Sequence, residues 1–546
     1  MSTTTVTLID SIKELFDIDV EPVLTRPEPQ FGDYTTNVAM QLAGRLQQPP
    51  RAIAERIAAK LTASGAYHRV DVAGPGFINL WLTSDGLLEL TTRDPLPARA
   101  GQDVVIETNN PNPFKAMHIG HAYNAIVADT MANLLAVSGA RTHRVSYHGD
   151  VGAHVGKSMW SLLRFCDGDP AKFAAIAPEE RNAFMNKMYA EGAAAAKEDE
   201  VAKEEIDTLA KQSFTREDPV YAAVYDTVKA WSFQEIDAIV RRLGNQPIEK
   251  RYLESQSDPI GVKTVLDHTP DVFKESDGAF IFEGSKYGSF DNAFVGSNGR
   301  GLYAARDLGL LQLKYRDYPT MTECIVVTGG EQAAYFKGVI AAAEQAIPET
   351  KGKLRNIPTG LVKLTTGKMS SRTGDVITID WLFDAFGAAI AEREGEVTDA
   401  IIAGALRYQF LKVKVGGDVV FDINEAVSLT GNTGSYLQYA HARARRMLQK
   451  TTAAAAPLTE VREEDRLLIR KLGEYHEIAQ LAMRTLEAHH LCTYLFELAQ
   501  EFNRYYEVHQ VVGSEHEAHR AAIVRLYADI LQAGLAILGI HAPDSM

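Results

Sequence analysis

The stretch Glu107-Thr-Asn-Asn-Pro-Asn-Pro-Phe-Lys-Ala-Met-His-Ile-Gly-His121 joins a strand-like run to a helical pattern through a polar loop that contains two prolines. Residues 103–106 before it (Asp-Val-Val-Ile) have the β-branched character of a buried parallel strand. After it, apolar residues recur at helical spacing as far as Leu135. A helix that begins after such a loop presents free backbone N–H groups and a positive dipole end, which suits phosphate. The stretch therefore predicts a nucleotide site in a βα unit.

Two histidines stand at the predicted start of this helix. His118 and His121 are three residues apart, so both side chains can face the same ligand. Gly120 lies between them and removes a side chain that would block a base or a sugar. Histidines at a helix start are often idle, so the pair alone does not decide the function.

A second polar loop, residues 363–375, contains two glycines, two lysines and an arginine. We expect Lys115, Lys368 and Arg372 to hold the phosphate oxygens of a triphosphate. The two histidines could donate hydrogen bonds to the oxygens of an in-line transition state. Positioning and electrostatics would then provide most of the catalysis.

Zinc binding is an alternative explanation for the histidines of this region, since imidazole is a common metal ligand. The candidates are His118, His121, His143, His148 and His154. We rank this alternative lower, because no cysteine joins the cluster and the glycines and lysines would be left unexplained. The three cysteines of the chain are far apart and have neither a disulfide pattern nor zinc-ligand spacing.

Two acidic residues are expected near the same edge of the sheet. Glu107 and Asp307 could recognise a cationic substrate, with an arginine or lysine side chain as the obvious ligand. A structural ion pair or a helix cap explains these two residues equally well.

Length and composition limit the possible classes of protein. A chain of 546 residues with 46% apolar and 23% charged residues is typical of a soluble protein with several domains. A formal net charge of −15 argues against a protein that coats nucleic acid without specificity. We see no signal peptide and no apolar run long enough to span a bilayer, so we expect a cytoplasmic protein without a membrane partner.

The pattern of elements predicts the α/β fold class. We expect a doubly wound parallel-sheet (Rossmann-like) catalytic domain, an N-terminal α+β domain and a C-terminal all-helical domain. Strand-like runs return at residues 279–282 and 325–328, as part of the sheet pattern between about 272 and 330. The predicted boundaries are 1–95 for the N-terminal domain, 101–375 for the catalytic domain with a helical insertion at about 166–245, 376–420 for a connecting region, and 421–546 for the helical domain.

The chain resembles the class I aminoacyl-tRNA synthetases and, among these, the arginyl enzymes. His118-Ile-Gly-His121 is the first class I signature as it stands, and Lys368-Met-Ser-Ser-Arg372 is similar to the second signature, Lys-Met-Ser-Lys-Ser. Further similarities to the arginyl enzymes are found at residues 31–39 and 73–79 in the N-terminal domain, 303–307 and 330–332 in the catalytic core, and 432–440 and 534–546 in the helical domain.

The resemblance implies a reaction and its partners. Arginine would be activated by ATP, which binds with Mg2+, and then transferred to the terminal ribose of tRNA(Arg). The first step would require the tRNA. The N-terminal domain would contact the outer corner of the tRNA, and the helical domain would bind its anticodon. We expect a monomer without a tightly bound metal.

The resemblance also implies roles for individual residues. Arginine would be surrounded by Glu107, Asn112, Tyr303, Asp307 and Gln332. ATP would be held by His118, Gly120, His121, Lys368, Met369, Ser370 and Ser371, and the catalytic residues would be His118, His121, Lys115 and Lys368. No residue is assigned to a metal.

One departure from the family pattern is informative. Ser371 stands where the second signature usually has its second lysine, and Lys115 occupies the place of a lysine that is thought to compensate for that loss. Two alternatives stay open at this point: a class I synthetase for another amino acid, and a tRNA-binding paralogue without catalysis.

Overall fold

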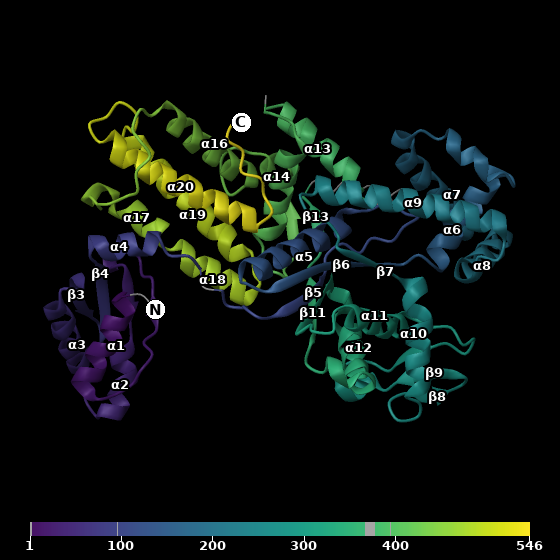
Figure 1. The fold of residues 1–546 in the computed structure, drawn as a ribbon, viewed down its shortest axis with the longest axis horizontal. Helices are drawn as coiled ribbons and strands as arrows, with labels where there is room; N and C mark the ends of the chain where they lie inside the picture. The colour runs from purple at the N-terminus through teal and green to yellow at the C-terminus, as the bar shows by residue number, and fades with distance from the viewer. Residues whose placement is uncertain (1–2, 96, 366–376, 394) are drawn as a thin grey trace.

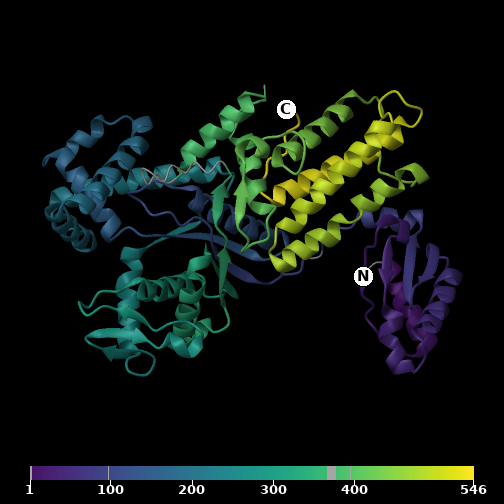
Figure 2. The same ribbon diagram turned by 180° about the vertical axis from the view of Figure 1, so that it is seen from behind.

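The computed structural model describes residues 3–95, 97–365, 377–393 and 395–546. An N-terminal module and a helical insertion lie at opposite ends of the long axis, with a parallel sheet and the C-terminal helices between them (Figure 1). The same arrangement is seen from behind in Figure 2. None of the helices in the described ranges combines the length and the apolar character needed to cross a bilayer.

The N-terminal module is an antiparallel sheet covered by helices, in the strand order β1-β2-β4-β3. Its strands are β1 (Leu24–Thr25), β2 (Tyr34–Thr36), β3 (Tyr67–Ala73) and β4 (Phe77–Leu82), and its helices are α1 (Thr3–Phe16), α2 (Val38–Leu46), α3 (Pro50–Ser64) and α4 (Ser84–Thr91). On α3, Ile53, Ile57 and Leu61 recur at helical spacing and are fully buried against the sheet. The α+β prediction is therefore confirmed.

The central sheet has five parallel strands in the order β12-β11-β5-β6-β7. They are β5 (Asp103–Glu107), β6 (Arg141–His148), β7 (Lys250–Leu253), β11 (Glu323–Gly329) and β12 (Leu354–Thr359), with helices α5 (Ile119–Val137), α11 (Tyr303–Asp317) and α12 (Ala333–Ala346) between them. The chain leaves β5 in one direction towards β7 and returns on the other side as β11. This reversal is the switch point at which doubly wound sheets bind ligands, and the predicted fold class is confirmed.

Two insertions interrupt the sheet. The first contains helices α6 (Ala153–Cys166), α7 (Arg181–Glu198), α8 (Glu200–Thr215) and α9 (Pro219–Arg242). The second contains α10 (Glu254–Asp267) and a separate antiparallel sheet of β8 (Lys274–Ser276), β9 (Ala279–Phe282) and β10 (Asn292–Val295). The strand-like run at 279–282 thus forms a strand, but outside the nucleotide-domain sheet. Residue pattern predicts a strand without specifying which sheet it joins.

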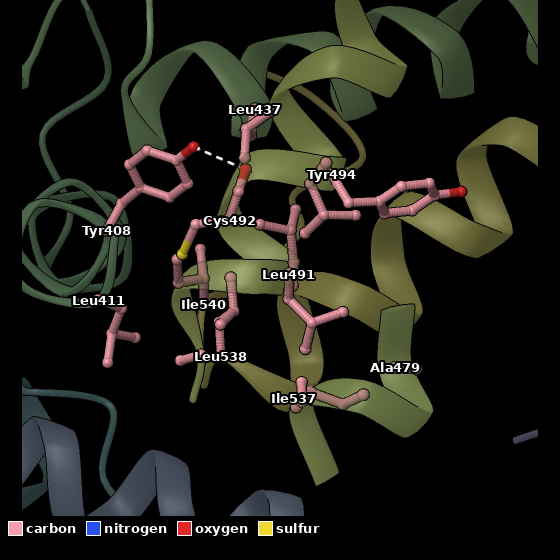
Figure 3. Packing of buried hydrophobic residues seen from close by; sticks show 14 of the residues in the cluster. Tyr408, Leu411, Leu437, Ala479, Leu491, Cys492, Tyr494, Ile537, Leu538 and Ile540 are labelled. Carbon is pink, nitrogen blue, oxygen red and sulfur yellow. Dashed lines mark hydrogen bonds between the residues drawn. The ribbon is translucent and has the colours of Figure 1, made fainter. Parts of the chain in front are cut away.

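The rest of the chain is almost wholly helical. A short parallel pair is formed by β13 (Val362–Leu364) and β14 (Val419–Phe421). The helices after β13 are α13 (Ile379–Ala391), α14 (Asp399–Leu411), α15 (Ile423–Ala426), α16 (Gly434–Lys450), α17 (Arg466–Leu472), α18 (Tyr475–Thr485), α19 (His489–Val508) and α20 (Glu517–Ile537), and β14 lies between α14 and α15. Figure 3 shows how their apolar side chains meet. The Tyr408 hydroxyl donates to the Cys492 carbonyl at 2.9 Å, which joins α14 to α19 inside this core.

A buried arginine connects α5 to the C-terminal helices. Arg407 of α14 is fully buried, and its Nη2 donates to Asp129 Oδ2 on α5 at 2.9 Å. Its Nε donates to the Leu538 carbonyl beyond α20 at 2.8 Å. A Cβ added at Gly539 would lie 2.2 Å from Arg407 Nη2, so only glycine fits there. The helix that begins with the histidine pair is thus fixed to both α14 and the end of the chain.

We expect Arg407→Ala to lower the free energy of unfolding by about 3–5 kcal/mol, because it removes the closest counter-ion of the buried Asp129 carboxylate and leaves only Arg144, whose Nε is 3.7 Å from Oδ1. Urea unfolding followed by circular dichroism measures this loss. Arg241→Ala, which removes an exposed guanidinium at the end of α9, is the control and should unfold as the wild type does. Equal stability of the two variants would contradict the role of the buried pair.

Candidate functional site

A cavity of about 410 Å³ opens at the carboxyl ends of β5 and β11. Four of the five residues expected to surround arginine line it: Glu107, Tyr303, Asp307 and Gln332. They come from β5, from the first turn of α11 and from the residue before α12. Residues as far apart in the sequence as Glu107 and Gln332 thus converge at the switch point of the sheet.

Glu107 ends β5 with its carboxylate in the interior, 4% exposed. Its Oε1 accepts a hydrogen bond from Lys314 Nζ in a buried ion pair. The alternative of a structural ion pair therefore applies to Glu107, although this carboxylate also lines the cavity. The sequence analysis missed Lys314, which lies seven residues after Asp307 on α11 and hence on the same helix face.

Asp307 is in a different situation. Its Oδ2 accepts a hydrogen bond from the Tyr335 hydroxyl at 2.5 Å, and no lysine or arginine of the described part of the chain forms an ion pair with it. Burial, together with the negative charges of Glu107 and Glu254, raises the pKa of Asp307 to about 7. The cavity therefore contains a carboxylate whose ionised form would be stabilised by a cationic ligand.

Tyr303 and Gln332 form the rim of the cavity. Tyr303 is 71% exposed at the first position of α11, and Asp307 lies one turn deeper on the same helix. Gln332 is also exposed, and Tyr335 follows it three residues later on α12. This i, i+3 spacing is the signal by which Tyr335 could have been found from the sequence.

Asn112, the fifth expected arginine ligand, lies outside the lining of this cavity. Its Oδ1 accepts a hydrogen bond from the Gly149 backbone N–H at 2.8 Å. A Cβ at Gly149 would approach that oxygen to 3.0 Å, so the glycine permits the close contact. In this structure Asn112 connects the loop after β5 to the turn after β6.

The two histidines are stacked at the start of α5, with ring centroids 3.7 Å apart. The His118 backbone N–H donates to His121 Nδ1 at 3.2 Å, so the proton of a neutral His121 is on Nε2 and can be donated to a ligand. Burial, with the nearby charges of His118 and Lys115, lowers the pKa of His121 to about 3. A Cβ at Gly120 would lie 3.1 Å from His118 Cε1, so this glycine also makes room for the His118 ring.

The described residues that follow the second signature contact the start of α5. Lys368, Met369, Ser370, Ser371 and Arg372 lie outside the described residues. The chain that follows them pairs with the start of α5, since the Ile119 N–H donates to the Ile377 carbonyl at 2.9 Å and His118 bridges to Thr378.

Lys115 lies close to this contact between Thr378 and the start of α5. It lines a narrow cavity of about 20 Å³ together with Thr378 and Asp380. Burial and the positive charge of Lys157 lower the pKa of Lys115. Its ammonium group forms no ion pair with a carboxylate of the described ranges, which leaves it available to an anionic ligand.

Among the described residues, the five histidines of the zinc alternative do not gather around one point. His143 contacts Asp103 at the opposite end of β5, His148 Nδ1 contacts the Pro111 carbonyl at 2.6 Å, and His154 Nε2 contacts the Gly149 carbonyl at 2.7 Å. These rings are engaged separately and do not converge. The one group of potential metal ligands among the described residues is in the helical region, at Glu487, His489 and His490.

We expect the affinity for arginine to fall as the pH drops through about 7, because protonation of Asp307 removes the charge that would face the guanidinium. Well below that pH, KM for arginine should rise by about tenfold per pH unit. Initial rates between about pH 8 and about pH 5 measure this. Asp307→Asn should raise KM and abolish its pH dependence, whereas an unchanged slope would exclude Asp307 as the titrating group.

Comparisons with known proteins cover nearly the whole chain. Residues 87–423 match the family described as tRNA synthetases class I (R), catalytic domain. Residues 4–82 match the arginyl tRNA synthetase N terminal domain, and residues 437–546 match the DALR anticodon binding domain. The catalytic-domain match alone spans more than half of the chain.

Individual proteins agree with these matches. An arginine–tRNA ligase of Thermobifida fusca is 29% identical over 571 residues, which covers 97% of this chain and 96% of that protein. One of Porphyromonas gingivalis is 26% identical over 573 residues, which covers 96% and 95%. The structure of Thermus thermophilus arginyl-tRNA synthetase has the same fold, with a TM-score of 0.79 at 23% identity over 100% of this chain and 99% of that one.

Proposed function

Because this chain belongs to the class I tRNA synthetases of the arginine (R) type, we propose that it activates arginine with ATP and transfers the arginyl group to the 3' end of tRNA(Arg). The observation that supports arginine most directly is the cavity at the switch point. It contains two carboxylates, and Asp307 has no cationic partner among the described residues. A planar guanidinium with several donors suits such a site.

The amino-acid site would be built in two layers. Glu107 and Asp307 would face the guanidinium from the inner wall, where burial strengthens each charge interaction. Tyr303 and Gln332 would enclose the ligand at the rim. Asn112 would contact the arginine from the neighbouring loop after β5. Lysine would leave acceptors without partners, which is a strong basis for rejection.

The ATP site would lie at the start of α5. Neutral His121 would donate from Nε2 to a phosphate oxygen, and His118 and Gly120 would complete the contact with the nucleotide. Mg2+ would arrive with ATP as its counter-ion. Lys368, Met369, Ser370 and Ser371 would bind the phosphates.

The proposed chemistry has two steps. A carboxylate oxygen of arginine attacks the α-phosphorus of ATP, and pyrophosphate leaves as arginyl-adenylate forms. The terminal ribose hydroxyl of the tRNA then attacks the arginyl carbonyl, and AMP leaves. The His118–His121 pair and Lys115 would stabilise negative charge in the first transition state, where positioning and electrostatics act together.

Binding of the tRNA would involve the two ends of the domain order. Residues 421–546 would hold the anticodon and residues 1–95 the outer corner. In the sequence, these two domains flank the catalytic domain at 101–375, with its insertion at about 166–245, and the connecting region at 376–420. A monomeric state and a cytoplasmic location belong to the same proposal. A paralogue without catalysis is disfavoured by the intact, neutral histidine pair.

Pyrophosphate exchange into ATP tests the proposed function. We expect exchange with arginine when tRNA is present, and much less with lysine, ornithine or the other amino acids, because their donors do not satisfy both carboxylates. Omitting the tRNA should abolish most of the exchange. Exchange supported by a different amino acid would establish another specificity, and no exchange with arginine and tRNA would exclude the enzyme.

We expect Lys115→Ala to slow exchange by about 100-fold if Lys115 replaces the missing lysine at position 371, since one positive donor to the phosphates is lost. Lys187→Ala removes an exposed lysine on α7 and serves as the matched control. The decrease should appear in kcat, with KM for arginine almost unchanged. Near-normal exchange by Lys115→Ala would show that this lysine has no such role.

A further inference from the structure

The motif Phe31-Gly-Asp-Tyr34 supported the resemblance to a tRNA-contacting domain, yet two of its side chains face the protein interior. Asp33 is 2% exposed and Tyr34 is 6% exposed, whereas Phe31 is 51% exposed. Asp33 and Tyr34 are therefore not available to a tRNA. Asp33 contacts α17 and Tyr34 contacts α18 of the helical domain instead. We call this contact the interdomain ion cluster: Arg26, Asp33 and Tyr34 with Arg466, Arg470 and Glu477.

One half of this cluster is centred on Arg26. Its guanidinium donates to both oxygens of Glu477, from Nε at 2.8 Å and from Nη2 at 3.0 Å. Arg26 Nη2 also lies 2.8 Å from the Tyr34 hydroxyl, which in turn donates to Glu477 Oε1. Although burial opposes ionisation of Glu477, the bonds from Arg26 hold the pKa of this carboxyl below its usual range. The bidentate geometry fixes direction as well as distance.

The other half is centred on Asp33. Its Oδ2 accepts from Arg466 Nη2 at 2.6 Å and from the Leu82 backbone N–H at 2.7 Å. Arg470 lies 3.4 Å from the other carboxylate oxygen and donates to the Pro27 carbonyl at 2.8 Å. A single carboxylate thus joins the end of β4 to α17.

These contacts determine orientation more than stability. Removing two charges from water costs about as much as their pairing returns, but the hydrogen bonds between these groups form in one geometry only. Close packing also restricts the interface between the N-terminal module and the helical domain, since a Cβ at Gly473 would lie 2.9 Å from Leu90 Cβ of α4. Figure 1 shows the N-terminal module seated under α17 and α18 along this contact.

We propose that Arg26, Asp33 and Tyr34 are positioning residues that hold the N-terminal module at a fixed angle on α17 and α18, so that one tRNA contacts both modules at once. This inference rests on the proposed function. When two binding modules are held in register, the second contact is made at high effective concentration. Rigidity also reduces the entropy lost on binding. The cluster therefore contributes to tRNA affinity without touching the tRNA.

The test uses the full chain with substitutions on the helical side only, so that the N-terminal module is unaltered. Glu477→Gln combined with Arg466→Met should raise KM for tRNA(Arg) by about tenfold. The value of kcat at saturating tRNA and KM for arginine should change by less than about twofold. Small-angle X-ray scattering should show a larger radius of gyration. Glu477→Asp keeps the charge, and its KM for tRNA(Arg) should lie between the values of the double variant and the wild type.

The matched control is Glu14→Gln, which removes a carboxylate that pairs with Lys60 at 2.6 Å within the N-terminal module and should leave KM for tRNA unchanged. Glu477→Gln alone replaces the double variant if the latter fails to fold. A wild-type KM for tRNA in these variants, or a fall confined to kcat, overturns the positioning role. Absence of charging by the wild type would instead overturn the proposed function.

Discussion

The pairing of β5 with β6 on one side and β11 on the other is the constraint on which the site depends. Glu107 is opposite Val145 and Val326 in the two registers. Because side chains alternate along a strand, Val105 and Glu107 point towards α11 and α12, while Val104 and Ile106 point towards α5. A shift by one residue would turn the Glu107 carboxylate away from the cavity.

Two carboxylates in one enclosed space must be stabilised without a ligand, and the structure does this in two ways. Glu107 is neutralised by Lys314, an ion pair of two buried side chains. Asp307 has a hydroxyl partner instead, and its raised pKa lets it take up a proton near neutral pH. The first arrangement is an ion pair with little net charge. The second leaves a charge that a guanidinium can stabilise, so the two acids of the cavity are not equivalent.

Connections over long distances hold the remaining parts around this sheet. Arg407 fixes the helix of the histidine pair to the end of the chain, and the interdomain ion cluster fixes the N-terminal module to α17 and α18. Both are charged groups removed from water, which are costly to leave unpaired. The molecule thus specifies the orientation of its modules by polar contacts, while apolar packing such as that in Figure 3 provides the burial.

The sequence by itself determined the βα unit, the position of His118 and His121 at the start of one helix, the order of the modules and the family. Each of these follows from local spacing or from contiguous motifs. It also indicated Glu107 and Asp307 as the acids of the site. Their partners were decided only by the tertiary structure. Lys314 is 207 residues from Glu107, and Arg466 is 433 residues from Asp33. No periodicity relates residues so far apart; the sheet order and the docking of α17 bring them together, and this packing decides which charges are paired.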